Sequence, residues 1–302
     1  MLSNTARLFL HSLWDLCTQT DKKELKALGK SATIKQIQAQ KDTKAGEKMK
    51  ADNYIAVFDS GVGGISVLRE LVKLMPNEKF LYFGDSANAP YGTRPAQQVR
   101  ALTLDAAQML YSRKIKALVV ACNTATSVAI EDLRAQYPQC IIIGIEPALK
   151  VAVEQCASGR IGVMATPVTL RQEKFQKQLT RFARSSVTCI PAPGVVELIE
   201  AGCTEGIQME QLLTSILAPY RGKLDALVLG CTHYPFVKKS IRKILGKQVM
   251  LFDGGAGTAR ETKRRLECAG LLHSGRGEVL VQNSAQTPAL LQLCNDLLNH
   301  DL

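Results

Sequence analysis

The chain has 302 residues, a length that predicts about two domains at roughly 150 residues each. Hydrophobic residues make up 46% and charged residues 22%, which excludes a mainly disordered or collagen-like chain. The formal net charge of +11 leaves nucleic acid and anionic small molecules open as partners, because net charge bears on steering and not on fold. No stretch approaches the roughly 18 uninterrupted apolar residues of a membrane helix, so no membrane span is predicted.

The cysteines favour a reducing compartment. There are nine of them, an odd number, and no two form a CxxC pair. This pattern argues against a disulfide scaffold and against a structural zinc site. The first residues show no convincing secretory signal, so we expect a cytoplasmic protein.

Residues 1–53 differ from the rest and are predicted to be an N-terminal extension. From Gly29 to Asn53 the sequence is rich in Lys, Gln and Ala and contains few large apolar residues. Nearer the start, Trp14 stands among leucines in an amphipathic patch that we expect to dock on the surface of the protein itself.

Beyond Asp52, short β-branched runs alternate with stretches of helical period. This alternation predicts an α/β fold with parallel sheets that are covered by helices on both faces. The predicted strands are Tyr54–Phe58, Lys79–Phe83, Ala117–Ala121, Ile141–Ile145, Arg160–Met164, Val187–Ile190, Ala226–Leu229 and Val249–Phe252.

The two halves of this region repeat each other. KALVVACNT, which contains Cys122, matches DALVLGCTH, which contains Cys231, and Tyr54–Gly61 matches Arg160–Pro167. Both pairs are separated by nearly the same number of residues, which indicates two copies of one α/β unit. We therefore predict two pseudo-symmetric domains with the two cysteines on opposite sides of the cleft between them.

Both repeat-related cysteines follow an apolar strand and open a polar turn that begins a helix. Unpaired N–H groups and the positive end of a helix dipole lie at such a turn, so we expect a lowered thiol pKa at each cysteine. Asp59 in the loop DSGVGG is placed to act as a base or to orient one, and His233 is placed to share a proton with Cys231. Two thiols across one cleft can remove a proton from one face of a carbon and return it to the other.

Four motifs, DSGVGG, YFGDSANAPYG, ACNTAT and GCTHYP, resemble in order and separation the cofactor-independent glutamate racemases of bacterial peptidoglycan synthesis. The resemblance implies that Cys122 takes the α-proton from D-glutamate and that Cys231 takes it from L-glutamate. It also implies that Asp59 assists Cys122, that His233 assists Cys231, and that Glu197 is the acidic residue near this histidine.

The same resemblance implies that the enzyme needs no metal and no pyridoxal phosphate, and that it supplies D-glutamate for the cell wall. Two domains, residues 54–146 with 253–302 and residues 147–252, would close over the substrate about hinges at Ile145-Glu146-Pro147 and Phe252-Asp253-Gly254. The substrate would be held by Asp59, Ser60, Tyr91, Gly92, Asn123, Thr124, Thr169, Thr232 and His233.

The sequence leaves several alternatives open. Some relatives with an N-terminal extension respond to UDP-N-acetylmuramoyl-L-alanine, so activation by this precursor is open here, and so is a homodimer. A sibling aspartate racemase is the nearest rival, although DSGVGG together with PYG favours glutamate. A redox protein that uses the two cysteines is another alternative, but this sequence contains no CxxC, flavin or nicotinamide motif. Nucleic-acid binding is not expected, because it would depend on net charge alone.

Overall fold

The computed structural model describes residues 49–145, 148–156, 159–181 and 186–299. They belong to a unit that begins at Met49. The predicted docking patch around Trp14 and the hinge residues Glu146 and Pro147 lie outside the described residues, as does the N-terminal extension apart from residues 49–53. Within the described ranges, no helix has the length and apolar character needed to cross a membrane.

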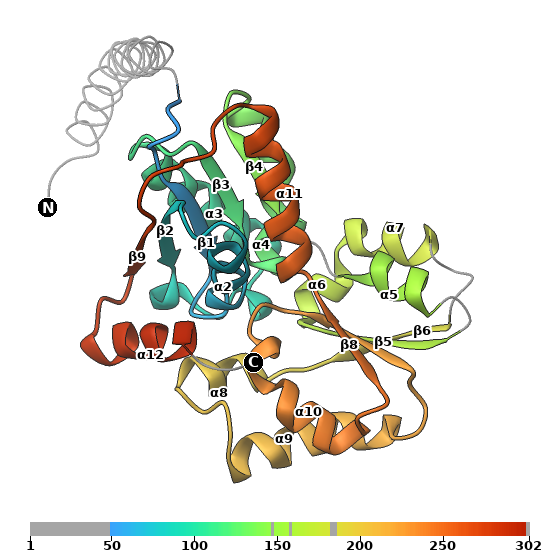
Figure 1. Ribbon diagram of the computed structural model, residues 1–302. Helices are drawn as coiled ribbons and strands as arrows, with labels where there is room; N and C mark the ends of the chain where they lie inside the picture. Colours follow the sequence, from blue (N-terminus) through green and yellow to red (C-terminus); the bar gives the residue numbers. More distant parts are fainter. Residues whose placement is uncertain (1–48, 146–147, 157–158, 182–185, 300–302) are drawn as a thin grey trace, which may run out of the picture. The chain divides into compact units, whose positions relative to one another are not determined.

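Five parallel strands form the first sheet, in the order β4-β3-β1-β2-β9 (Figure 1). They are β1 (Ile55–Asp59), β2 (Lys79–Gly84), β3 (Ala117–Val120), β4 (Ile141–Gly144) and β9 (Glu278–Asn283). Ile55 and Val57 pack on one face against α2 (Ile65–Leu74), α11 (Gly255–Cys268) and α12 (Pro288–Asn299). Ala56 and Phe58 pack on the other face against α3 (Ala96–Tyr111) and α4 (Asn123–Gln136). All residues of β1 are buried, as expected for a central parallel strand.

Four parallel strands form the second sheet, in the order β6-β5-β7-β8. They are β5 (Arg160–Ala165), β6 (Ser186–Pro191), β7 (Ala226–Gly230) and β8 (Met250–Asp253). One face carries α5 (Leu149–Gln155), α6 (Pro167–Arg171) and α7 (Glu173–Arg181). The other carries α8 (Val195–Glu200), α9 (Ile207–Leu217) and α10 (Lys238–Leu245). The predicted fold class, two parallel-sheet α/β domains, is confirmed.

Short 3₁₀ helices complete the loops. They are η1 (Ser86–Asn88), η2 (Tyr91–Thr93), η3 (Ala218–Tyr220) and η4 (Tyr234–Val237). Two of them, η1 and η2, follow β2, and η4 follows β7, so three of the four lie beyond the carboxyl ends of strands.

The strand orders confirm the internal repeat. Read from one edge, β4-β3-β1-β2 of the first sheet corresponds to β8-β7-β5-β6 of the second. The repeat-related pairs of the sequence, β1 with β5 and β3 with β7, are the central strands of each sheet. Cys122 and Cys231 therefore follow equivalent strands, at the edge where the loops of parallel sheets meet ligands.

Strand β9 was not predicted from the sequence. It is the outer strand of the first sheet beside β2, and several of its side chains are exposed or half-buried. Its sequence, EVLVQN, is half polar and lacks the continuous apolar run that marks the other strands of this sheet, so local pattern did not indicate a strand. Its last residue, Asn283, is buried at the carboxyl edge that carries Cys122.

Candidate active site

Cys122 lies at the N-cap of α4, directly after β3. Its sulfur accepts a hydrogen bond from the backbone N–H of Ala125 at 3.4 Å and donates one to Ser60 Oγ at 3.3 Å. Only 4% of the residue is exposed. Ser60 follows β1, which neighbours β3 in the sheet, so two loops of adjacent strands bring these side chains together.

The expected lowering of the thiol pKa does not occur at Cys122. Burial, together with the nearby charge of Asp59, raises the pKa of Cys122 to about 12. The hydrogen bonds from Ser60 and Ala125 oppose this shift, but they are outweighed because the thiol is fully enclosed.

Asp59 is fully buried at the end of β1. Its carboxylate accepts hydrogen bonds from the Gly61 N–H and from Thr232 Oγ1, both at 3.0 Å. Burial raises the pKa of Asp59 above its usual value, whereas the neighbouring His233 opposes the rise. Thr232 lies in the loop after β7 of the second sheet, so Asp59 is held in place by a residue next to Cys231.

Cys231 directly follows β7, and its sulfur lies 3.6 Å from Nδ1 of His233. On the other side of the imidazole ring, Nε2 lies 2.6 Å from Oε1 of Glu200. Glu200 accepts two further hydrogen bonds, from the Val62 N–H at 2.7 Å and from Ser86 Oγ at 3.0 Å.

These contacts make His233 and Glu200 a charged pair. Burial lowers the pKa of His233, but hydrogen bonds to Cys231 and Glu200 more than offset this and raise it well above 6.5. Burial raises the pKa of Glu200, but its hydrogen bond to His233 and the charge of His233 bring it below its usual value. An imidazolium therefore points one N–H at the sulfur of Cys231 and the other at a carboxylate.

The acid beside His233 is Glu200 and not Glu197. Both are on α8, but Glu197 is exposed, whereas the side chain of Glu200 is 15% exposed and contacts Nε2 of His233. The sequence contained a usable signal, because Val196 is buried and lies four residues before Glu200, on the same helix face. Helical periodicity therefore favours Glu200 as the acid near His233, whereas the resemblance implied Glu197.

Three threonine hydroxyls meet beside the cysteines. Thr124 Oγ1 lies 3.2 Å from Oγ1 of both Thr166 and Thr169, and the last two are 3.0 Å apart. Thr166 was not among the predicted site residues, and its side chain also lies against Gly92, where an added Cβ would come within 2.7 Å of it.

Asn123 Oδ1 is buried without a hydrogen-bond partner among the described residues. Such an orphaned acceptor is rare in a folded protein and suits a bound donor. Tyr91 is also buried, and its hydroxyl donates to Asp85 at 2.7 Å, so its polar end is already engaged. Among the described residues no cluster of His, Cys, Asp and Glu is arranged to hold a metal ion.

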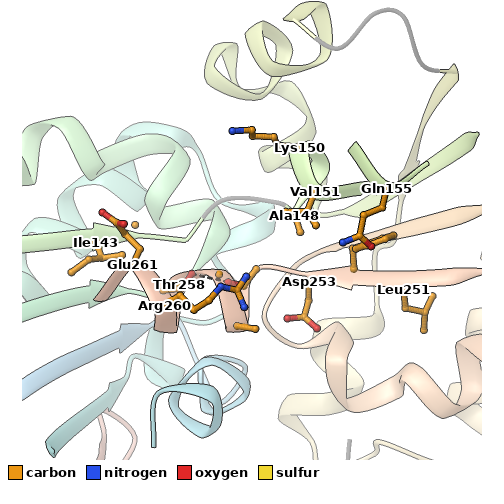
Figure 2. Close-up of a pocket in the computed structure, with 15 residues that line it drawn as sticks. Ile143, Ala148, Lys150, Val151, Gln155, Leu251, Asp253, Thr258, Arg260 and Glu261 are labelled. Atoms are coloured by element: carbon orange, nitrogen blue, oxygen red, sulfur yellow. Dashed lines mark hydrogen bonds between the residues drawn. The ribbon is translucent and has the colours of Figure 1, made fainter. Parts of the chain in front are cut away.

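A hollow of about 500 Å³ lies where the chain passes between the sheets (Figure 2). It is lined by the end of β4, by α5, by β8 and by the first turn of α11, and it contains none of the candidate active-site residues. Lys150 and Arg260 contribute cationic side chains, and Asp253 contributes a carboxylate that pairs with Lys238 at 2.7 Å. This hollow borders the second predicted hinge, whereas hinge motion itself remains a prediction.

Residues 56–262 match the model of the Asp/Glu/Hydantoin racemase family. The chain belongs to this family. A glutamate racemase of Clostridium kluyveri is 49% identical over 252 residues, which are 82% of this chain and 98% of that relative. The match confirms the predicted resemblance and the predicted enzyme class: the chain is a racemase, an isomerase.

Solved structures agree with this membership of the Asp/Glu/Hydantoin racemase family. Glutamate racemase from Francisella tularensis, in complex with D-glutamate, superimposes with a TM-score of 0.74 at 28% identity, covering 83% of this chain and 95% of that one. Glutamate racemase of Escherichia coli, in complex with L-glutamate and the activator UDP-MurNAc-ala, gives a TM-score of 0.70 at 31% identity, covering 80% and 92%.

Proposed function

We propose that this racemase interconverts L-glutamate and D-glutamate by two-base proton transfer between Cys122 and Cys231. The observation that carries the proposal is that these thiols follow equivalent strands. Hydrogen bonds from Cys122 to Ser60 and from Thr232 to the neighbouring Asp59 bring the two cysteine loops together. Each thiol has an acidic or basic neighbour, Asp59 on one side and His233 on the other. The comparisons support glutamate as substrate, because the similar proteins are glutamate racemases.

In the L-to-D direction, the thiolate of Cys231 removes the α-proton of L-glutamate and becomes a thiol. The thiol of Cys122 then delivers its proton to the opposite face of the carbanion and becomes a thiolate. No electron is gained or lost, and the proton count is unchanged. A pKa of about 12 keeps Cys122 protonated before turnover, which suits it to act as the acid in this direction.

In the reverse direction, Cys122 must first lose its proton. Asp59 is the candidate to receive that proton, because it adjoins Ser60, which contacts the Cys122 thiol, and because burial raises its pKa. His233, held as an imidazolium by Glu200, stabilises the thiolate of Cys231 until that sulfur is needed as a base.

Substrate recognition in this proposal uses the polar groups between the cysteines. Asn123 Oδ1, which lacks a partner among the described residues, would accept from the α-ammonium group. Hydroxyls of Thr124 and Thr169 and the N-terminal N–H groups of α4 would hold the carboxylates and stabilise negative charge at the α-carbon. Thr232, whose hydroxyl donates to Asp59, would line the site on the Cys231 side. Ser60, Tyr91 and Gly92 would shape the remaining wall.

The test is racemisation of each glutamate enantiomer in D₂O, followed by circular dichroism and by deuterium at the α-carbon. Cys122→Ser and Cys231→Ser should each lose most activity, whereas Cys268→Ser, at an exposed position on α11, serves as the matched control. Turnover of aspartate alone would replace glutamate by the sibling substrate, and full activity in either active-site cysteine variant would refute the two-base assignment.

We further propose that D-glutamate from this reaction enters peptidoglycan synthesis in the cytoplasm, as the resemblance implies. A homodimer is also proposed from the resemblance. Light scattering coupled to size-exclusion chromatography tests it, and a monomer at working concentration would contradict it.

Activation by UDP-N-acetylmuramoyl-L-alanine is proposed for the hollow in Figure 2. The similar E. coli enzyme was solved with such an activator. The Gly255 N–H at the start of α11 is donated to Asp253, but Ala256 and Gly257 offer N–H groups to a diphosphate, and Arg260 and Lys150 add cations. Arg260→Ala should weaken activation without lowering the basal rate, and an unchanged rate of the wild-type enzyme with the precursor would exclude this regulation.

A further inference from the structure

We propose that Ser86, oriented by Asn283, is a positioning residue for the Cys231 half of the reaction, through Glu200 and His233. Its hydroxyl fixes the second oxygen of Glu200, whose first oxygen holds His233 against Cys231. The inference rests on the proposed function for the role of Cys231, but the contacts that carry it are independent of the substrate.

A continuous chain of hydrogen bonds links β9 to the sulfur. Asn283 Nδ2 donates to Ser86 Oγ at 2.9 Å, and Ser86 Oγ donates to Glu200 Oε2 at 3.0 Å. Glu200 Oε1 lies 2.6 Å from His233 Nε2, and His233 Nδ1 lies 3.6 Å from Cys231 Sγ. The links from Asn283 to Ser86, from Ser86 to Glu200 and from Glu200 to His233 each join elements that are far apart in sequence, so this series of hydrogen bonds exists only in the folded protein.

The direction of the chain is fixed at its far end. Asn283 is 2% exposed, and its Oδ1 accepts from the Ala285 N–H at 3.0 Å. The amide must therefore present its NH₂ group to Ser86. Because Ser86 Oγ accepts that bond, its single hydrogen is directed at Glu200, where it meets a carboxylate that can only accept.

This series of hydrogen bonds also joins the two α/β domains. Glu200 is on α8 of the second domain, whereas Ser86 and Val62 follow strands of the first. The pair of Glu200 and His233 is therefore completed by groups from across the domain boundary. In an open state that separates these loops, Glu200 would lose two of its three hydrogen bonds, so full positioning of His233 is coupled to closure.

Two variants test the orientation rather than the mere presence of these side chains. Ser86→Ala removes the donor. Asn283→Asp is isosteric but presents oxygens in place of the NH₂ group, so the Ser86 hydroxyl would turn its hydrogen away from Glu200. Ser284→Ala is the matched control, because this neighbouring hydroxyl accepts from the Ala87 N–H and does not contact Glu200.

The kinetic readout is the α-deuterium isotope effect in each direction. The equilibrium constant of a racemase is one, so kcat/KM must fall equally in both directions, and we expect a fall of about tenfold for Ser86→Ala and Asn283→Asp. Deuterated L-glutamate loses its label to Cys231, so a slower step there raises its isotope effect. Deuterated D-glutamate loses its label to Cys122, and its isotope effect should fall.

A second readout needs no substrate. The alkylation rates of Cys231 and Cys122 in the resting protein are measured by peptide mass spectrometry. Weaker positioning of His233 should lower the ratio of the Cys231 rate to the Cys122 rate in both variants and leave it unchanged in Ser284→Ala.

The outcomes separate the two ideas. Isotope effects and alkylation ratios equal to those of Ser284→Ala would overturn the positioning role, as would a loss of activity with both isotope effects unchanged. A wild-type protein that does not racemise glutamate would contradict the proposed function alone, and the alkylation ratio would still decide for or against the positioning of His233.

Discussion

Replacing Glu200 by glutamine tests the charged pair at the centre of the Cys231 half. The amide keeps one oxygen for His233 Nε2 and the Val62 N–H, which lie 2.6 Å and 2.7 Å from Oε1, but it faces Ser86 with a donor. Bonds to charged groups are worth about 1.5–3 kcal/mol and neutral ones about 0.5–1.5 kcal/mol. The substitution removes the bond from Ser86 and weakens the bonds from His233 and Val62. Because the side chain of Glu200 is only 15% exposed, we expect the free energy of unfolding to fall by about 3 kcal/mol.

That loss predicts two measurable changes in Glu200→Gln. The Tm should fall by roughly 6–12 °C, because about 1 kcal/mol corresponds to 2–4 °C in a protein of this size. The kcat/KM for glutamate should fall by about tenfold to a hundredfold, since part of the loss is shared by the resting enzyme and the transition state.

Glu197→Gln is the matched control, because it makes the same chemical change on the exposed face of the same helix. We expect its stability to change by less than about 0.5 kcal/mol and its kcat/KM to stay at the wild-type value. Differential scanning calorimetry and polarimetry on both variants decide the matter. A large effect at Glu197 with none at Glu200 would refute the structural assignment and restore the one made from the sequence.

Three further predictions concern Gly63, Lys116 and the pH dependence of stability. Gly63→Ala should lower kcat/KM at least about tenfold and cost about 1–3 kcal/mol, because its Cβ would lie 2.3 Å from His233 Nδ1; steady-state kinetics and urea unfolding measure both. Lys116→Met should destabilise the fold by about 3–5 kcal/mol, because it leaves the buried Glu78 without the ammonium group that lies 2.6 Å away. The folded enzyme should keep its kcat/KM, because Lys116 precedes β3 at the edge of the sheet opposite the cysteines. The stability that Glu200 and His233 contribute should be greatest between pH 4.5 and 6.5. Because the pKa of Glu200 is lowered, its contribution is lost as the pH falls through that pKa. Because the pKa of His233 is raised, its contribution is lost as the pH rises through that pKa. Unfolding free energies of wild type and Glu200→Gln across pH measure this window, and a difference that does not vary with pH would contradict it.

Local pattern in the sequence was sufficient for the architecture. Buried parallel strands need continuous apolar runs, so the central strands β1, β3, β5 and β7 were legible, and their repetition predicted two similar sheets. The same logic located Cys122 and Cys231, because a polar turn after an apolar strand ends at the loop edge of a parallel sheet. The edge strand β9 has no such run and was missed.

The electrostatic state of the site was decided only by tertiary structure. A helix N-terminus predicts a lowered thiol pKa, but the enclosure of Cys122 and the charge of Asp59 raise it, and both depend on what packs around the sulfur. Likewise, the choice of Glu200 over Glu197 depends on which face of α8 meets His233 across the fold.

The sequence by itself therefore determined strands β1 to β8, the repeat and the pair of thiols, because these follow from periodicity and from residue types that are adjacent in the chain. Only the tertiary structure joined Asn283, Ser86, Glu200 and His233. Hydrogen bonds between residues so far apart in sequence leave no local pattern, since their energy depends on distances of about 3 Å that folding alone creates.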